Sequence, residues 1–191
     1  MPTRRSFAAL FAVVAPVLAQ DVPIDVSRST ITIHAGKAGL LSAAGHDHWI
    51  NAPISSGSIN DSATPHVAFT VETAKMTVKP DPKVDSKTQA TIQKDMEEMT
   101  LETAKYREIA FRATRVEKTG DGQWKVDGDL SLHGVTKTVS VAVKRSGEAY
   151  SGHTTLKQTD YGIKPVSVGG GTIKVKNEIE IDFQIYLRPA V

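Results

Sequence analysis

The sequence predicts an all-β fold, a single closed antiparallel barrel of seven or eight strands with one helix. The first observation is a regular alternation of apolar and polar residues over 123–143, which restarts after Gly134 as it does in a β-hairpin. The second is the same alternation over 173–187, a strand too long to lie flat without twisting or bending. The third is that residues 80–105 break this pattern. A β-sandwich is the alternative architecture, and the long strands favour the barrel.

The N-terminal part of the chain predicts two strands and an unusual connection. Apolar residues alternate with polar ones in 24–35, which predicts the first strand, and the glycine-containing segment 36–39 predicts a turn. Residues 45–50 read GHDHWI, the most unusual hexapeptide of the chain, and the serine-rich segment 55–58 resembles a loop. Residues 66–78 predict another strand.

One helix is predicted over about residues 87–104. The segment 86–89, SKTQ, matches a capping box, in which a hydroxyl and a later side chain satisfy free backbone amides. Ile92, Met96 and Met99 follow at spacings of four and three residues, so they share one face of a helix. This apolar stripe is thin, and we therefore expect the helix to cap one end of the barrel.

The C-terminal part of the chain completes the barrel. Residues 109–116 predict a strand, 120–122 a turn into the central hairpin, and 150–156 another strand. Segments 160–163 and 169–171 bracket a loop, and the triple glycine predicts a flexible hairpin tip. The long alternating strand then ends the fold.

Residues 1–19 are predicted to be a signal peptide outside the folded domain of 20–191. Two arginines precede an apolar run that is too short for a permanent membrane span, and VLA at 17–19 fits a small-residue cleavage site. The segment 3–7, TRRSF, also resembles a twin-arginine signal, and an ordinary Sec signal is the alternative. Either route predicts a periplasmic or secreted protein.

Charge and cysteine content narrow the possible partners. The chain holds 23 Lys and Arg against 21 Asp and Glu, and two of the arginines belong to the predicted leader. The mature part is therefore formally neutral, which argues against a nucleic-acid partner. With no cysteine, neither disulfides nor a lipoprotein anchor are expected.

The inward positions of the predicted barrel indicate a hollow interior that holds a chain lipid. Apolar side chains on separate strands converge on one axis when a barrel closes, and an eight-stranded barrel can hold one small ligand. Burying about ten methylenes gives roughly 8 kcal/mol before association costs. Such a site requires no catalytic residue and no cofactor, and none is predicted. The predicted wall, with an adaptable methionine lid, consists of Phe69, Val71, Met96, Met99, Phe111, Trp124, Val126, Leu130, Leu132, Tyr161, Ile179, Ile181 and Phe183.

His46 and His48 are the alternative site. On an extended segment, residues two apart point the same way, so the two imidazoles could converge on a metal ion while Asp47 faces away. Catalytic zinc usually takes three protein ligands, and the sequence shows no third partner. We therefore interpret the segment as structural, with Trp49 packed into the core.

Four segments carry a resemblance to a known family. Residues 128–139, GDLSLHGVTKTV, are similar to the signature of the YceI-like family, as are 24–29, IDVSRS, 105–111, KYREIAF, and 160–163, DYGI. These likenesses extend over nearly the whole predicted mature chain. The departures are Arg28 in place of a usual histidine, Arg107 in place of a proline, Gln158 near a usual arginine, and the unusual 45–49 segment.

The resemblance implies an eight-stranded antiparallel lipocalin-like barrel with the helix over one end. Proteins of that family are secreted bacterial proteins that bind polyisoprenoids or other long-chain amphiphiles, and the resemblance suggests a homodimer. Two functions therefore stay open: a periplasmic lipid-binding or carrier protein, and a metal-binding protein or metal-assisted enzyme that uses His46 and His48. Native mass spectrometry of the mature protein discriminates between them.

Overall fold

The computed structural model describes residues 21–39, 46–60, 65–168, 170 and 172–189. The predicted signal peptide lies outside these residues. In the described part of the chain, eleven strands form one antiparallel sheet in the order β1-β5-β6-β8-β9-β10-β11-β14-β2-β4-β7. The strands of this main sheet are β1 (Val22–Pro23), β2 (Thr30–Ala35), β4 (His48–Asn51), β5 (Ser56–Asn60), β6 (His66–Glu72), β7 (Thr77–Val78), β8 (Glu108–Gly120), β9 (Gln123–Leu132), β10 (Val135–Ser146), β11 (Ala149–Lys157) and β14 (Glu178–Tyr186).

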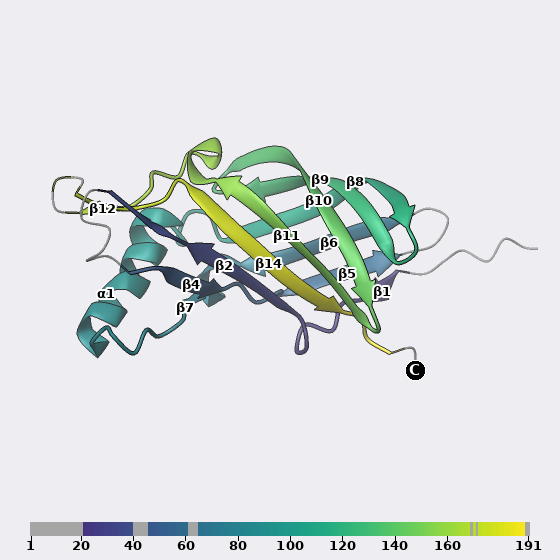
Figure 1. Cartoon of the computed structure of the whole chain (residues 1–191), viewed down its shortest axis with the longest axis horizontal. Helices are drawn as coiled ribbons and strands as arrows, with labels where there is room; N and C mark the ends of the chain where they lie inside the picture. The colour runs from purple at the N-terminus through teal and green to yellow at the C-terminus, as the bar shows by residue number, and fades with distance from the viewer. Residues whose placement is uncertain (1–20, 40–45, 61–64, 169, 171, 190–191) are drawn as a thin grey trace, which may run out of the picture.

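A small sheet and four helical segments complete the described structure. The small sheet pairs three short strands in the order β12-β13-β3. Figure 1 shows α1 and β12 at the same end of the elongated molecule. These elements are β3 (Lys37–Ala38), β12 (Ser167–Val168), β13 (Ile173–Val175), α1 (Ser86–Asp95), the π-helical turn η3 (Met96–Thr100), and the 3-10 turns η2 (Thr73–Lys75) and η4 (Gln158–Tyr161).

The main sheet curls until the chain just after β1 reaches the chain just after β14. Just after β1, Ile24 forms an isolated antiparallel bridge with Leu187, which follows β14. The Arg188 amide donates to the Pro23 carbonyl at 2.9 Å, and the Asp25 amide donates to the Tyr186 carbonyl at 2.8 Å. These bonds form a seam between the N-terminal and C-terminal parts of the sheet, at the end opposite α1 (Figure 1).

The predicted central hairpin is confirmed. Strands β9 and β10 pair from Val135 opposite Leu132 to Lys144 opposite Gln123 without a register shift. His133 and Gly134 form the turn with φ angles of 51° and 76°. Two consecutive positive φ angles match the twist of a two-residue hairpin, and Gly134 adopts its angle without a steric cost.

The predicted count of eight strands is not confirmed, because predicted strands are interrupted. The single strand predicted over 66–78 divides into β6 and β7 at η2. Thr73 holds this break: its hydroxyl donates to the Tyr106 carbonyl at 2.7 Å, and its amide donates to the Arg107 carbonyl at 3.0 Å. These two bonds continue the β6–β8 register to Thr73, and the chain turns at η2 directly afterwards.

Segment 55–58, interpreted as a loop, lies mostly within β5. Strand β5 pairs with β6 from Ser56 opposite Thr70 to Asn60 opposite His66, and it pairs with β1 on its other edge. A Cβ on Gly57 would lie 2.7 Å from both the Ala68 carbonyl oxygen and the Phe69 Cβ. Position 57 therefore requires glycine, because β6 approaches it closely. The sequence prediction interpreted this segment as a loop, although a glycine within a strand can also mark such a close approach.

The helix is confirmed, but its predicted end and cap are wrong. The α-helix ends at Asp95, and a π-helical turn continues to Thr100, so residues 101–104 are not helical. Asp85 is the N-cap, and its carboxylate accepts hydrogen bonds from the amides of Lys87 and Thr88. Aspartate at this position satisfies the free amides that the predicted capping box assigned to Ser86.

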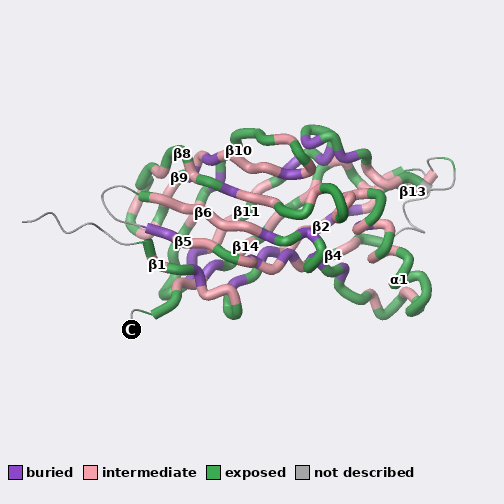
Figure 2. Tube along the Cα trace, turned by 180° about the vertical axis from the view of Figure 1, so that it is seen from behind, coloured by how far each residue is buried: buried purple, intermediate pink, exposed green. Residues whose placement is uncertain are grey.

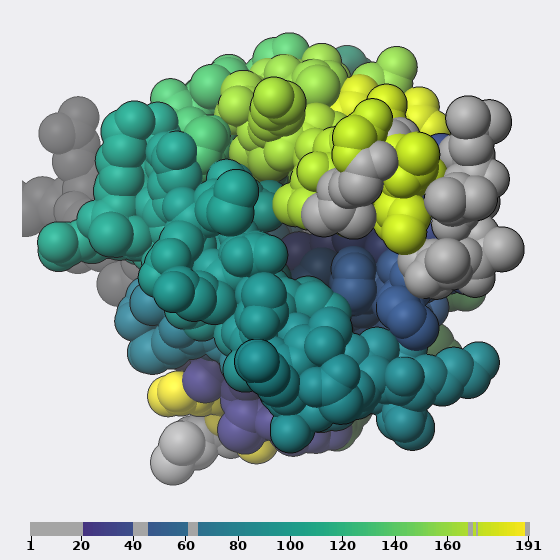
Figure 3. Space-filling view, turned by 90° about the vertical axis from the view of Figure 1, so that its left-hand side faces the viewer, coloured from purple at the N-terminus to yellow at the C-terminus, as the bar shows by residue number. Residues whose placement is uncertain are grey.

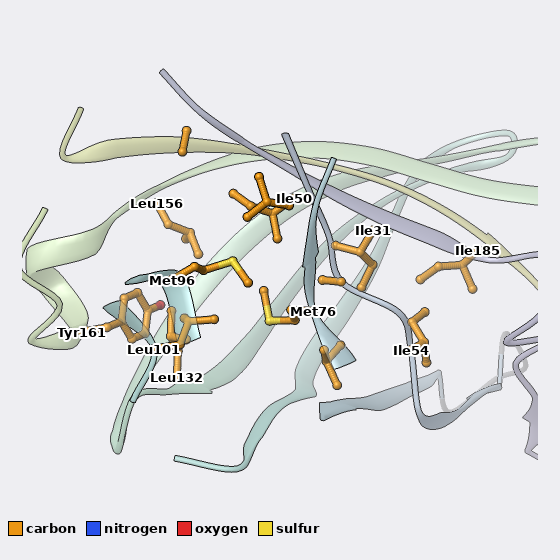
Figure 4. Packing of buried hydrophobic residues seen from close by; sticks show 14 of the residues in the cluster. Ile31, Ile50, Ile54, Met76, Met96, Leu101, Leu132, Leu156, Tyr161 and Ile185 are labelled. Carbon is orange, nitrogen blue, oxygen red and sulfur yellow. The ribbon is translucent and has the colours of Figure 1, made fainter. Parts of the chain in front are cut away.

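Buried side chains form one cluster inside the curled sheet. In Figure 2, buried and half-buried stretches alternate with exposed ones along the strands, as expected for a sheet with one dry face. In Figure 4, Tyr161, Leu101 and Leu132 lie at one end of the cluster and Ile54 and Ile185 at the other. The cluster surrounds the cavity described next.

Candidate ligand-binding cavity

A cavity of about 560 Å³ lies inside the curled sheet. Its walls come from nearly every strand of the main sheet and from α1 and η3. This volume falls within the roughly 300–1,000 Å³ range of small-molecule sites. Figure 3 shows the molecule hollowed at the α1 end, between the helix and the segment around β11 to β13. The geometry therefore offers an apolar space that is open at one end.

Twelve of the thirteen predicted wall residues line this cavity. They come from β6, η3, β8, β9, η4 and β14. Whether they contact a ligand stays a prediction. These residues are Phe69, Val71, Met96, Phe111, Trp124, Val126, Leu130, Leu132, Tyr161, Ile179, Ile181 and Phe183.

The placement of Met99 in the wall is wrong. Met99 is 72% exposed, and it does not contribute to the cavity, whereas Met96 is buried and does. In the π-helical turn the Leu101 amide donates to the Met96 carbonyl, five residues earlier, at 2.9 Å. This wider turn rotates Met99 away from the face of the helix that Met96 occupies. Thr100 and Leu101 line the cavity instead.

Several wall residues were missed by the sequence prediction. Ile31 and Ile33 on β2, Ile50 on β4 and Val78 on β7 line the cavity. The alternation on β2 was recognised, but it was not connected with the cavity. Strands β4 and β7 are only four and two residues long, so they carry too few residues for a periodic signal.

Three phenylalanines lie against glycines on the inner face of the sheet, Phe111 and Phe183 with their rings and Phe69 with its Cβ. Phe69 and Phe183 are paired across strands with Gly57 and Gly152, and a Cβ on either glycine would collide with the partner side chain. A Cβ on Gly128 would likewise collide with the ring of Phe111. All three phenylalanines line the cavity. The glycines therefore let these rings lie close to the wall.

Tyr161 lines the cavity from η4, which directly follows the end of β11. It is 2% exposed, and in Figure 4 its hydroxyl points toward the interior of the cluster. Burial raises the pKa of this phenol, and the charge of Asp160 raises it further. His133 in the hairpin turn lies with its Nδ1 3.3 Å from the Tyr161 carbonyl oxygen, so the central hairpin helps to position η4.

The four charged residues that line the cavity in the described part of the chain belong to the same group as two histidines and a threonine of α1. We call this group the mouth, and it consists of Lys37, His46, His48, Thr88, Asp95, Lys157 and Lys174. Its members come from β3, the start of β4 and the segment just before it, α1, the end of β11 and β13. The mouth is therefore polar, and the walls behind it are mainly apolar.

His46 and His48 both line the cavity. Nδ1 of His46 lies 3.3 Å from a carboxylate oxygen of Asp81. Burial lowers the pKa of His48, and the charge of His46 lowers it further. Among the described residues, no group of three or more His, Cys, Asp or Glu side chains could hold a metal ion.

The neighbours of this histidine pair have structural contacts. Asp47 accepts a hydrogen bond from the Lys37 amide at 2.9 Å, which lowers the pKa of its carboxyl group. Trp49 was expected in the core, but it is 45% exposed and stacks on His34 with the ring centroids 4.3 Å apart.

None of the helices in the described segments is long and apolar enough to cross a membrane.

Fold and cavity together define a small β protein built around an apolar space of ligand size. The family model described as the YceI-like domain matches residues 23–187, and the chain belongs to this family. This confirms the resemblance drawn from residues 128–139 and the three other segments.

Relatives and solved structures agree with this assignment. The chain is 35% identical over 94 residues to a UPF0312 protein of Pseudomonas syringae pv. syringae (strain B728a), which covers 44% of this chain and 47% of that protein. It is 32% identical over 92 residues to a UPF0312 protein of Shewanella sp. (strain ANA-3), covering 43% and 48%. The matched region thus spans about half the length of these curated relatives.

The fold is also found in solved structures. BcnA of Burkholderia cenocepacia aligns with a TM-score of 0.61 at 15% identity, covering 85% of this chain and 98% of that one. A polyisoprenoid binding domain from Saccharophagus degradans aligns with a TM-score of 0.59 at 14% identity, covering 90% and 100%. At these identities the comparisons establish the fold alone.

Proposed function

We propose that this protein binds a long-chain amphiphile, an isoprenoid or a similar lipid, inside the curled sheet and acts as a carrier. The observation that carries the proposal is the apolar cavity of about 560 Å³ with its polar mouth. A linear apolar chain fits such a space, because its tail contacts the walls while its polar end stays at the mouth. The description of the Saccharophagus domain as polyisoprenoid binding supports the same ligand class.

The energetics are sufficient for this function. Each buried methylene contributes about 0.8 kcal/mol, so ten carbons contribute about 8 kcal/mol before the cost of association. Micromolar binding corresponds to about 8 kcal/mol. A chain longer than ten carbons therefore offsets part of the association cost without any specific polar contact.

The two tryptophans provide a test. Trp124 lines the cavity and Trp49 is exposed on the surface. In a Trp49→Phe variant, fluorescence reports on Trp124, and titration with geranylgeraniol is expected to change its intensity and emission maximum. The matched Trp124→Phe variant retains Trp49 and is expected to show no change.

Native mass spectrometry of the purified mature protein is the second measurement. The expected result is a bound amphiphile, either retained from the cell or taken up from added geranylgeraniol. Absence of both a mass shift and a Trp124 response would refute the proposed function. A stoichiometric metal ion that is lost in a His46→Ala/His48→Ala variant would favour the metal alternative.

We also infer that the chain is exported, from the charged and apolar leader at residues 1–19. N-terminal sequencing of protein isolated from the periplasm should start at Gln20. An intact Met1 or a purely cytoplasmic location contradicts this inference. The homodimer implied by the family resemblance stays a prediction that light scattering can test.

A further inference from the structure

The side chain of Tyr161 presents an unpaired hydroxyl to the cavity. Tyr161 is 2% exposed and lines the cavity from η4. In Figure 4 its hydroxyl points toward the interior of the apolar cluster, and the side chains labelled at the same end are those of Leu101 and Leu132. Within the segments that the structure describes, no hydrogen bond joins this hydroxyl to another protein atom. A polar atom without a protein partner therefore stands in an apolar wall.

The turn that carries Tyr161 is held in place by other bonds. The Gln158 backbone amide donates to the Asn177 carbonyl at 2.8 Å, and the Gln158 side-chain amide donates to the Lys176 carbonyl at 2.7 Å. Nδ1 of His133 lies 3.3 Å from the Tyr161 carbonyl oxygen. These contacts fix η4 through its backbone and through Gln158. The Tyr161 hydroxyl is therefore not needed to position the turn.

The hydroxyl is a hydrogen-bond donor at physiological pH. Burial raises the pKa of the phenol, and the charge of Asp160 raises it further. The phenol therefore keeps its proton at neutral and mildly alkaline pH. A protonated phenol donates one hydrogen bond, and an acceptor oxygen is its natural partner.

The position of η4 places this donor at the hollowed end of the molecule. The turn η4 follows β11 and precedes β12, which lies at the same end as α1 (Figure 1). The molecule is hollowed at that end (Figure 3). The proposed ligand keeps its polar end at the mouth, so Tyr161 lies on the side of the cavity where that ligand carries its polar atoms.

A plain hydrocarbon chain would leave the hydroxyl without a partner. A ligand that fills the cavity displaces solvent from the hydroxyl, and a buried hydroxyl without a hydrogen bond costs free energy. The ring of a tyrosine contributes apolar area to a wall, but a phenylalanine would supply the same ring without this cost. An acceptor oxygen on the ligand removes the cost. Apolar binding sites use a few placed polar groups of this kind to orient and select their ligands.

We propose that the bound amphiphile carries an acceptor oxygen of the carbonyl type at the polar end of its chain, and that the Tyr161 hydroxyl donates a hydrogen bond to this oxygen. The inference rests on the proposed function, because the chain must occupy the cavity to bring the oxygen to Tyr161. Tyr161 then selects oxygenated chains over hydrocarbons of equal length.

Two ligands that differ in one carbonyl oxygen test this inference. Methyl tetradecyl ketone and hexadecane have the same number of carbons, and each is titrated against wild-type Tyr161 and Tyr161→Phe, both in the Trp49→Phe protein with Trp124 fluorescence as the readout. Tyr161→Phe should weaken binding of the ketone about tenfold, as expected for the loss of one buried hydrogen bond. It should bind hexadecane as tightly as before or more tightly. Each ligand is compared with itself, so the difference in solubility between the two cancels.

A control and a spectroscopic measurement assign the effect to the hydrogen bond. Tyr186→Phe removes a hydroxyl outside the cavity, from a ring that packs against the Arg28 guanidinium at 4.4 Å, and it should change neither affinity. The infrared stretching band of an isotope-labelled ketone should lie at lower frequency when bound to the protein with Tyr161 than when bound to Tyr161→Phe. Because the variant removes only an unpaired hydroxyl, its Tm should not fall.

The outcomes separate this inference from the proposed function. An equal change for ketone and hydrocarbon in Tyr161→Phe, or a carbonyl band that does not shift, overturns the hydrogen bond and leaves lipid binding in place. The same selective loss in Tyr186→Phe overturns the assignment to Tyr161. Binding of geranylgeraniol without binding of the ketone overturns this inference alone. Failure of all three ligands to bind overturns the proposed function together with this inference.

Discussion

Replacing Gly152 with alanine should push an aromatic ring into the cavity. The added Cβ would lie 2.5 Å from Cζ and 2.8 Å from Cε1 of Phe183, and 2.7 Å from the Ala142 carbonyl oxygen. The carbonyl belongs to the paired backbone of β10 and cannot move without breaking the ladder. The Phe183 ring therefore moves, and the open direction is the cavity that it already lines.

The expected magnitudes follow from this displacement. Overpacking of this kind costs about 1–3 kcal/mol, which corresponds to a fall of roughly 3–9 °C in Tm for a chain of this size. A ring that occupies the space of two or three ligand methylenes removes about 2 kcal/mol of binding free energy, so Kd should rise about thirtyfold.

The assay combines thermal unfolding with titration of geranylgeraniol. Gly120→Ala is the matched control, because its added Cβ would come no closer than 3.6 Å to Gln123; its Tm and Kd should stay near those of wild type. In a Gly152→Ala/Phe183→Leu variant the smaller side chain should recover much of the lost affinity. Unchanged Tm and Kd in Gly152→Ala would refute the reasoning that the glycine keeps the ring against the wall.

Three further predictions concern the wall, the helix cap and the mouth. Leu130→Trp should reduce the uptake of lipid, because the larger ring enters the cavity, whereas Met99→Trp on the exposed side of η3 should not. Lipid uptake is measured by extraction and mass spectrometry. Equal uptake in both variants would mean that the cavity does not bind the lipid at Leu130. Asp85→Ala should lower Tm by about 2–4 °C because the first turn of α1 loses its cap. Asp121→Ala, which removes an exposed acid in a turn, should not lower Tm. Equal decreases in Tm would mean that the loss of a negative charge, and not the loss of the cap, destabilises the protein. The lowered pKa of His48 means that, as pH falls below about 6.5, the unfolded chain takes up a proton that the folded chain resists, so stability declines toward acid. Tm measured from pH 8 to pH 5 should fall less in His48→Gln than in wild type, and parallel curves contradict this assignment.

Side-chain alternation was sufficient to predict the dry face of the long strands. On β9 and β14, Trp124, Leu130 and Ile181 line the cavity as their parity predicted. These strands are long enough for the period of two to be visible, and one face of each is buried or half-buried along its whole length. The sequence therefore predicted much of the wall before the pairing was known.

The rest depended on contacts between distant segments. Hydrogen bonds from Thr73 to the segment before β8 fix the position where β6 ends and η2 begins, and no local pattern predicts this position. The exposed position of Met99 results from a π-helical turn, which has the same residue types as an α-helical one. The polar mouth was not predicted, because its residues come from segments far apart in the sequence.

The seam beside β1 has a consequence for how the chain folds. Ile24 and Leu187 lie near opposite ends of the described chain, so their bridge closes a very long loop. Contacts of such high sequence separation cost the most chain entropy and form slowly. The sheet cannot be sealed until β14 is present, and a chain still emerging from the ribosome or a translocation channel keeps its apolar inner face open.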